Sequence, residues 1–292
     1  MKNSILYYIE TFNPINTYLL ITLTMKKIAF CIYLIFICIH FSQAVDNQFP
    51  ADIRFLGTGV RGITGSVLAN PAVAARVEQI ETGLSFYNRY AMKGTSTVSF
   101  SCIVPFRSVH IAGFFSSFGD KRYRDTQASL SVGKRWGNRL STGIGLTYRF
   151  VRMQSVQGVP AFVSAAFGAT YQPVDNVCAA LTVINVPSVS AGNLPFRGFT
   201  GYALTAGCSW RVIRSVLLVA EAENTFETGI RGGAGVEYTL FPACTVRAGI
   251  GTAPLQPCVG AGYDFGRIRI DAVACYHREL GVSTGVELKV KW

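Results

Sequence analysis

From Gly83 to Trp292 the chain repeats short stretches in which apolar and polar residues alternate, each followed by a turn. In the last stretch, Val286, Leu288 and Val290 share one face with the terminal Trp292. Because successive side chains of a strand point to opposite faces, each stretch can offer lipid an apolar stripe and keep its charges on the other face. The pattern predicts a membrane-spanning β-barrel, with Trp292 as the C-terminal aromatic recognised by the barrel-assembly machinery.

Composition supports a barrel over a helical membrane protein. The chain is 50% hydrophobic and only 15% charged, yet no stretch after Ala44 offers the roughly 20 nearly continuous apolar residues of a spanning helix. A soluble β-sandwich would also alternate, but its outward faces would be rich in Lys and Glu. Here the polar faces are mainly Gly, Ser, Thr and Ala. We therefore expect an all-β, transmembrane antiparallel barrel.

The spacing of the alternating stretches predicts about fourteen strands, an even number that suits a closed antiparallel barrel. The even-numbered connections are uniformly short, and the longest odd-numbered one runs from Pro187 to Thr200. Outer-membrane barrels pair short periplasmic turns with longer external loops, so 187–200 is expected to be the principal external loop. The expected strands lie near 83–90, 95–105, 108–117, 126–135, 139–151, 160–172, 177–186, 201–212, 215–223, 229–240, 243–251, 256–265, 267–277 and 281–292.

The N-terminal region has the features of an export signal. Residues 25–44 comprise a basic start at Lys26 and Lys27, an apolar run and a small-residue exit at Ala44, the order of a cleavable signal peptide. Residues 1–24 are interpreted as a misread upstream start, which would place the true start at Met25; a start at Met1 is the alternative. Export followed by barrel insertion predicts the outer membrane of a Gram-negative cell.

The net charge of +11 does not indicate nucleic-acid binding, because Lys and Arg are spread over turns and strand faces rather than gathered with aromatics. Anionic outer-membrane lipid is the expected counter-charge. The six cysteines after residue 44 sit singly in apolar strand stretches, where a free cysteine behaves as a small hydrophobe. Their spacing gives no zinc site.

Charged residues also occur on the faces predicted to line the lumen: Glu221, Arg231, Glu237, Arg247, Arg269 and Asp271. A symmetric turn at Phe241-Pro242 would place Glu237 opposite Arg247, and the next hairpin would bring Glu221 toward Arg231. We interpret these residues as ion pairs that hold a narrow barrel, with a substrate path as the alternative.

Little in the sequence indicates catalysis or a cofactor. Residues 57–62 match the Gly-rich dinucleotide pattern, but no strand precedes them and no β-α series follows. His110 and His277 have no recognisable Ser or Asp pattern around them. A lipid hydrolase at the barrel rim would need one of them beside a Ser and a carboxylate. We expect no enzyme activity, no cofactor and no metal.

The N-terminal part carries a family resemblance. Residues 56–72 contain Leu-Gly-Thr-Gly, then Gly-Ile-Thr-Gly-Ser-Val-Leu and Ala-Asn-Pro-Ala, and residues 83–90 read Gly-Leu-Ser-Phe-Tyr-Asn-Arg-Tyr. This arrangement resembles the FadL-like outer-membrane barrel superfamily, and within it most closely the PorV and PorQ type proteins of the Bacteroidota. The resemblance covers 54–292. It implies a fourteen-stranded barrel (83–292) whose lumen is partly closed by an N-terminal plug (45–82) containing Asn70, Pro71 and Ala72.

Two functions follow from the resemblance. FadL proteins pass hydrophobic compounds, whereas PorV and PorQ types serve type IX protein secretion or surface attachment. Val73 stands where the family usually has Gly, and the loops are short for a FadL transporter. We therefore prefer the PorV/PorQ-like role, with secretion-system proteins as partners, and keep FadL-like uptake of small hydrophobic compounds as the alternative.

Overall fold

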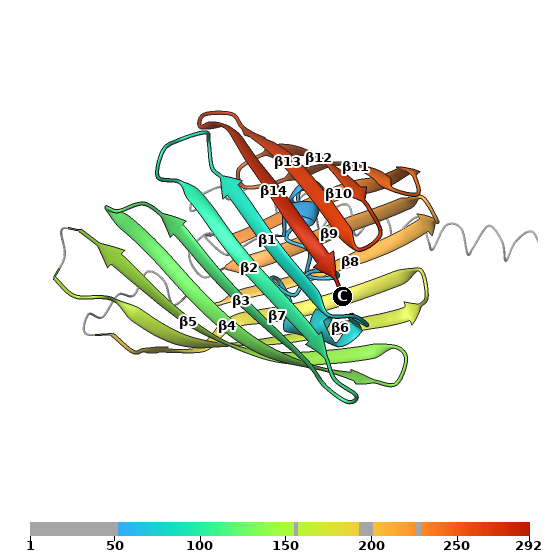
Figure 1. Cartoon of the computed structure of the whole chain (residues 1–292), viewed down its shortest axis with the longest axis horizontal. Helices are drawn as coiled ribbons and strands as arrows, with labels where there is room; N and C mark the ends of the chain where they lie inside the picture. The colour runs from blue at the N-terminus through green and yellow to red at the C-terminus, as the bar shows by residue number, and fades with distance from the viewer. Residues whose placement is uncertain (1–51, 155–156, 193–200, 226–228) are drawn as a thin grey trace, which may run out of the picture. The chain divides into compact units, whose positions relative to one another are not determined.

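The computed structural model describes residues 52–154, 157–192, 201–225 and 229–292. The expected signal peptide and misread start lie outside these residues. Fourteen antiparallel strands form a closed barrel, in which every strand pairs with its neighbours along the chain and β1 pairs with β14 (Figure 1). The predicted fold class and strand number are confirmed. No helix among the described residues has the length and apolarity needed to cross a bilayer.

The strands are of unequal length, and the longest lie in the middle of the sequence. Their bounds are β1 Glu81–Asn88, β2 Ser96–Pro105, β3 His110–Gly119, β4 Tyr123–Trp136, β5 Leu140–Met153, β6 Ala161–Val174, β7 Val177–Ser190, β8 Ala203–Ile213, β9 Val216–Thr225, β10 Gly229–Phe241, β11 Cys244–Gly251, β12 Gln256–Asp264, β13 Ile268–His277 and β14 Gly281–Lys291.

Closure depends on the pairing of the first and last strands. β1 and β14 are in register from Glu81 with Lys291 to Asn88 with Thr284. Trp292 follows this pairing: its backbone N–H donates to the Ile80 carbonyl at 2.9 Å, and its side chain is 71% exposed. The terminal aromatic therefore stands at the seam where the barrel closes, on the outside of the wall.

The connections that follow even-numbered strands contain two to four residues, as expected. The expected external loop 187–200 is corrected at its start, because β7 continues to Ser190. A register shift between Ser164 and Ala166 of β6 leaves β7 a bulge, which lets the strand resume pairing beyond Pro187. Residues 193–200 of that expected loop lie outside the described part of the chain.

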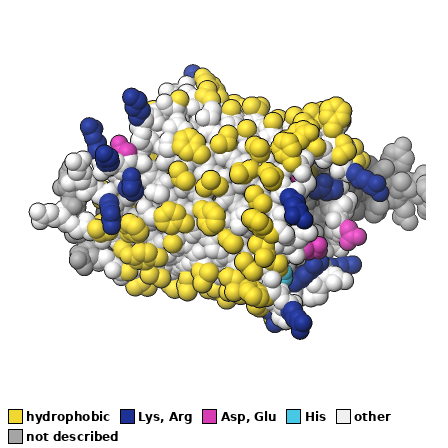
Figure 2. All heavy atoms as spheres, viewed as in Figure 1, with side chains coloured by type: hydrophobic (Ala, Val, Ile, Leu, Met, Phe, Trp, Pro, Cys, Tyr) yellow, Lys and Arg dark blue, Asp and Glu magenta, His cyan; other side chains and the backbone are white. Residues whose placement is uncertain are grey.

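Alternation along the strands separates two surfaces. Outward side chains such as Leu130, Ile144 and Leu146 are between 55% and 60% exposed, while the inward positions between them on the two strands are mainly Ser, Thr and Gly. Figure 2 shows the outward apolar side chains as a belt across the visible face, with Lys and Arg near its two ends. This is the surface expected of a barrel embedded in lipid.

Charged substitutions inside and outside the apolar belt test where the belt lies. Leu130 lies near the middle of β4, so Leu130→Arg should lower the free energy of unfolding by about 2–4 kcal/mol, because a charge at the bilayer midplane is poorly solvated. Phe265→Arg, in the β12–β13 turn, should cost less than about 1 kcal/mol. Urea unfolding in lipid bilayers measures both values. Equal costs at the two positions would contradict the placement of the belt.

Candidate functional site: a plugged lumen

Residues 52–80 lie inside the barrel and contact its wall on several sides (Figure 1). The segment contains a short helix, α2 Ile53–Leu56, and a 3-10 helix, η3 Pro71–Arg76. α2 contacts β12, β13 and β14, whereas η3 contacts β2 to β6. We call residues 52–80 the plug segment. Its apolar side chains are buried against inward residues of the wall, as in the cluster of Ile53 with Val273.

Asn70, Pro71 and Ala72 form a tight corner within the plug segment, and all three are buried. The Asn70 Oδ1 accepts a hydrogen bond from the Ala72 N–H at 2.9 Å and so caps η3. Its Nδ2 donates to the Ile63 carbonyl at 2.9 Å and to the Ala169 carbonyl of β6 at 3.3 Å. One amide side chain thus orders the corner and ties it to the wall.

The wall is made of glycine where this corner meets it. A Cβ placed on Gly143 of β5 would lie 2.5 Å from the Ala72 nitrogen, closer than real side chains approach. At Gly145, two residues along the same strand face, the nearest atom would be 3.4 Å away. Glycine at 143 is therefore required by the close approach of two backbones, whereas glycine at 145 is not.

A network of buried charges joins the plug segment to β10, β11 and β13, away from the strands that the Asn70 corner contacts. The Arg247 Nε lies 2.7 Å from Glu237, and its Nη1 lies 2.7 Å from Asp271 in ion-pair rather than hydrogen-bond geometry. Asp271 also pairs with Arg269 at 2.8 Å. Glu237 receives a second guanidinium, that of Arg54 in α2, at 2.6 and 2.8 Å. The Glu237–Arg247 pair expected from the hairpin therefore belongs to a larger network.

The expected Glu221–Arg231 pair is wrong. β9 extends to Thr225, and its register with β10 places Arg231 opposite Glu223 and Glu221 opposite Gly233. Arg231 accordingly forms an ion pair with Glu223 at 2.6 Å.

Glu221 instead accepts three hydrogen bonds from the backbone of the plug segment. The donors are the N–H groups of Arg61, Gly62 and Ile63, at 2.7–2.9 Å. Its carboxylate anchors the plug backbone.

Sequence reasoning missed the charged residues of the plug segment itself. Asp52 pairs with Lys289 of β14 at 2.7 Å, and Arg61 pairs with Glu223. Burial would raise the pKa of the Asp52 carboxyl, but the Lys289 ammonium outweighs it and holds the pKa below its usual value. Likewise, Glu237 raises the pKa of Arg54 although burial opposes this. Isolated charges in a Gly-rich, apolar segment were the signal that could have identified these anchors.

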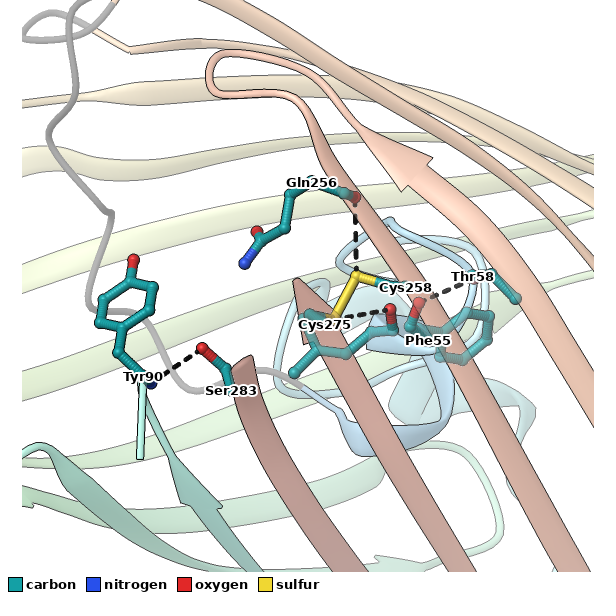
Figure 3. Close-up of a disulfide and its surroundings, with 8 residues drawn as sticks. Phe55, Thr58, Tyr90, Gln256, Cys258, Cys275 and Ser283 are labelled. Carbon is teal, nitrogen blue, oxygen red and sulfur yellow. Dashed lines mark hydrogen bonds between the residues drawn. A yellow bond between two sulfur atoms is a disulfide. The ribbon is translucent and has the colours of Figure 1, made fainter. Parts of the chain in front are cut away.

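The cysteines also required a correction. Cys258 of β12 and Cys275 of β13, expected to be free, form a disulfide (Figure 3). They are directly opposed in the β12–β13 register, which brings their side chains together. Both are buried against Ile53 and Leu56 of α2. The disulfide therefore lies on the lumen side of the wall and packs against α2 of the plug segment.

Cavities lie toward both ends of the lumen around the plug segment. One, of about 290 Å³, is lined by residues near the odd-numbered connections, among them Tyr87, Tyr90, Arg231 and His277. A smaller one of about 60 Å³ lies beside Phe114 and Phe162. The third, of about 120 Å³, is lined by residues near the opposite end: Glu81, Arg269, Lys289 and Lys291.

Neither histidine has the surroundings that a rim hydrolase would need. The His277 Nδ1 accepts hydrogen bonds from the backbone N–H groups of Glu279 and Leu280, both at 3.2 Å. Its ring packs edge-to-face with that of Tyr90, and the two ring centres are 5.6 Å apart. No hydrogen bond from His110 or His277 to a Ser or carboxylate side chain is found in the described ranges. Those ranges also hold no cluster of three or more His, Cys, Asp or Glu suited to a metal.

The contrast between two glycines tests how the plug segment is seated. Gly143→Ala should displace the Pro71–Ala72 corner and cost about 1–3 kcal/mol, the usual range for overpacking, whereas Gly145→Ala should change little. Limited trypsin digestion of the folded protein, followed by mass spectrometry, reports exposure of Arg61 and Arg76. Faster cleavage there in Gly143→Ala alone is the expected result. Equal cleavage in both variants would mean that the corner does not depend on glycine 143.

The comparison with known proteins identifies the fold. No family model and no curated protein matches the chain. Among solved structures, the CymD monoaromatic hydrocarbon channel has a TM-score of 0.58 and 12% identity, covering 81% of this chain and 94% of that one. The Ralstonia pickettii toluene transporter TbuX has a TM-score of 0.57 and 10% identity, covering 84% and 98%.

A Pseudomonas aeruginosa FadL homologue has a TM-score of 0.54 and 12% identity, covering 86% of this chain and 98% of that one. These similarities extend over most of both chains, while identities this low establish the fold alone. The chain therefore has the fold of FadL-type outer-membrane barrels.

Proposed function

We propose that this protein is an uptake channel for small hydrophobic compounds, the alternative derived from the FadL resemblance. The observation that carries the proposal is the position of the plug segment, which lies within the lumen between the cavity of about 290 Å³ and that of about 120 Å³. Such an arrangement suits a channel that binds its substrate before passing it, because a fixed obstruction excludes free diffusion of solutes.

The larger cavity limits the size of the substrate. Its volume of about 290 Å³ is at the lower end of the roughly 300–1,000 Å³ typical of ligand pockets. Its wall combines apolar and aromatic side chains, such as Val60, Tyr87 and Leu280, with polar and charged ones: Arg61, Arg89, Glu221, Glu223, Arg231 and His277. A single-ring aromatic compound with at most a small polar group fits this space better than a long acyl chain.

The named activities of the structural neighbours support the same substrate class. TbuX is a toluene transporter and CymD a monoaromatic hydrocarbon channel. These activities belong to those proteins, and the shared fold makes them the first to test here. The secretion or attachment role of PorV/PorQ-type proteins remains a prediction from the motifs in residues 56–72 and 83–90. Affinity purification from outer membranes, with mass spectrometry of bound proteins, tests it through recovery of secretion components.

Filling the larger cavity tests the uptake proposal. Gly251 lines it, and a Cβ there would meet no atom closer than 3.5 Å. Gly251→Phe should occupy the space and abolish most of the uptake of radiolabelled toluene by cells that carry the protein. Gly251→Ala, at the same position, should retain native uptake.

Heat-modifiable migration in gel electrophoresis checks that both variants fold. Native uptake by folded Gly251→Phe, or no uptake by the native protein above cells that lack it, would overturn the proposal.

A further inference from the structure

Two arginines stand directly opposite each other on the outer surface of the barrel. Arg124 of β4 is the register partner of Arg152 of β5. Both side chains are exposed and share the outward face with Leu130 and Leu146. Like charges in directly opposed positions of neighbouring strands destabilise a sheet. An anion bound between the two guanidinium groups would offset this repulsion and so stabilise the pairing of β4 with β5.

The described part of the chain supplies no carboxylate that pairs with either arginine. Asp125 points inward and pairs with Arg149. Asp120, in the neighbouring connection, accepts the backbone N–H groups of Arg122 and Tyr123 at 2.8 and 3.3 Å. These hydrogen bonds, and then the charges of Arg122 and Arg124, lower the pKa of Asp120. The Asp120 carboxylate therefore stabilises the β3–β4 turn and forms no ion pair with Arg124 or Arg152.

The opposed pair is part of a larger basic group at this end of the molecule. Lys121 and Arg122 are both exposed in the β3–β4 connection. Figure 2 shows Lys and Arg side chains gathered at the end of the visible face where β3 and β5 finish in Figure 1. The charge there is strongly positive, because the described residues of β3, β4, β5 and their connections hold only two acids, Asp120 and the inward, buried Asp125 that pairs with Arg149.

The position of the pair along β4 places it at the level of lipid head groups. The opposite edge of the apolar belt is marked by Lys134, whose Nζ lies 4.3 Å from the centre of the Trp136 ring. The ten residues from Arg124 to Lys134 span about 33 Å along a strand. A tilt of about 40° reduces this to about 25 Å, the height of the apolar band of an outer-membrane barrel.

We propose that Arg124 and Arg152 form a binding site for the phosphate of an outer-leaflet lipid. A guanidinium binds phosphate through two parallel N–H donors, so two facing arginines can hold one phosphate group between them. Tyr148 and Phe150 continue the same outward face toward the apolar belt, and the Arg152 guanidinium lies 5.6 Å from the Phe150 ring. They would contact the part of the lipid next to its phosphate. The site anchors a lipid and is separate from the lumen.

Native mass spectrometry of the purified mature barrel in detergent, titrated with diphosphoryl lipid A, tests this site. The double variant Arg124→Gln with Arg152→Gln should bind the lipid about tenfold or more weakly, since it loses charge-assisted hydrogen bonds from both arginines. The matched control is Lys134→Gln with Arg139→Gln, which removes the same charge at the other end of β4. It should bind within about twofold of the native protein, because it keeps the facing pair Arg124 and Arg152.

Three results would overturn the proposal. The first is unchanged binding by the Arg124/Arg152 variant, and the second is an equal loss in the Lys134/Arg139 control, which would indicate general basic attraction. The third is complete displacement of the lipid by millimolar inorganic phosphate, which would indicate a site for free anions. All variants change exposed side chains, and heat-modifiable migration in gel electrophoresis verifies that each barrel is folded.

Discussion

The hydrogen bonding between β1 and β14 is the constraint on which the rest of the structure depends. Lipid offers no partner to backbone N–H and C=O groups, so a sheet can remain in a membrane only if it has no free edge. Eight consecutive register pairs, from Glu81–Lys291 to Asn88–Thr284, remove that edge. Once the sheet is closed, alternation assigns every side chain either to lipid or to the lumen, and the lumen must be filled or left to water.

The plug segment fills the lumen through contacts that are specific rather than merely apolar. Arg54 reaches Glu237, Arg61 reaches Glu223, and the plug backbone donates three hydrogen bonds to Glu221. Burying charges is costly unless they are paired and hydrogen-bonded. Each of these three wall acids therefore has a partner in the plug segment, either an arginine or a set of backbone N–H groups. Without the plug segment, Glu221 would lose these three hydrogen-bond donors. The charges of the wall therefore favour one seated position of the plug.

The sequence was sufficient for the barrel because a period of two is imposed on every strand by lipid on one side. Strand number, short even-numbered turns and the inward placement of Glu237, Arg247 and Asp271 all follow from that period. Register does not, because a change of two residues preserves the period. This is why Arg231 pairs with Glu223 rather than Glu221.

The plug contacts were beyond prediction for a different reason. They join residues far apart in the chain, such as Asn70 and Ala169, and no local pattern encodes their proximity. The Cys258–Cys275 disulfide likewise depends on a β12–β13 register that spacing alone leaves open. The short loops of the chain favoured secretion over uptake in the sequence, whereas our proposal of uptake rests on the cavities on both sides of the plug segment.

The most direct test of a seated plug is the ionic conductance of single barrels in planar lipid bilayers, compared between the mature protein and a version lacking residues 52–80. A plug that fills the lumen predicts low, steady conductance in the complete protein and a large increase when the segment is removed. Equal conductance in the two proteins, with both barrels folded, would show that these residues do not close the lumen and would contradict a plugged channel.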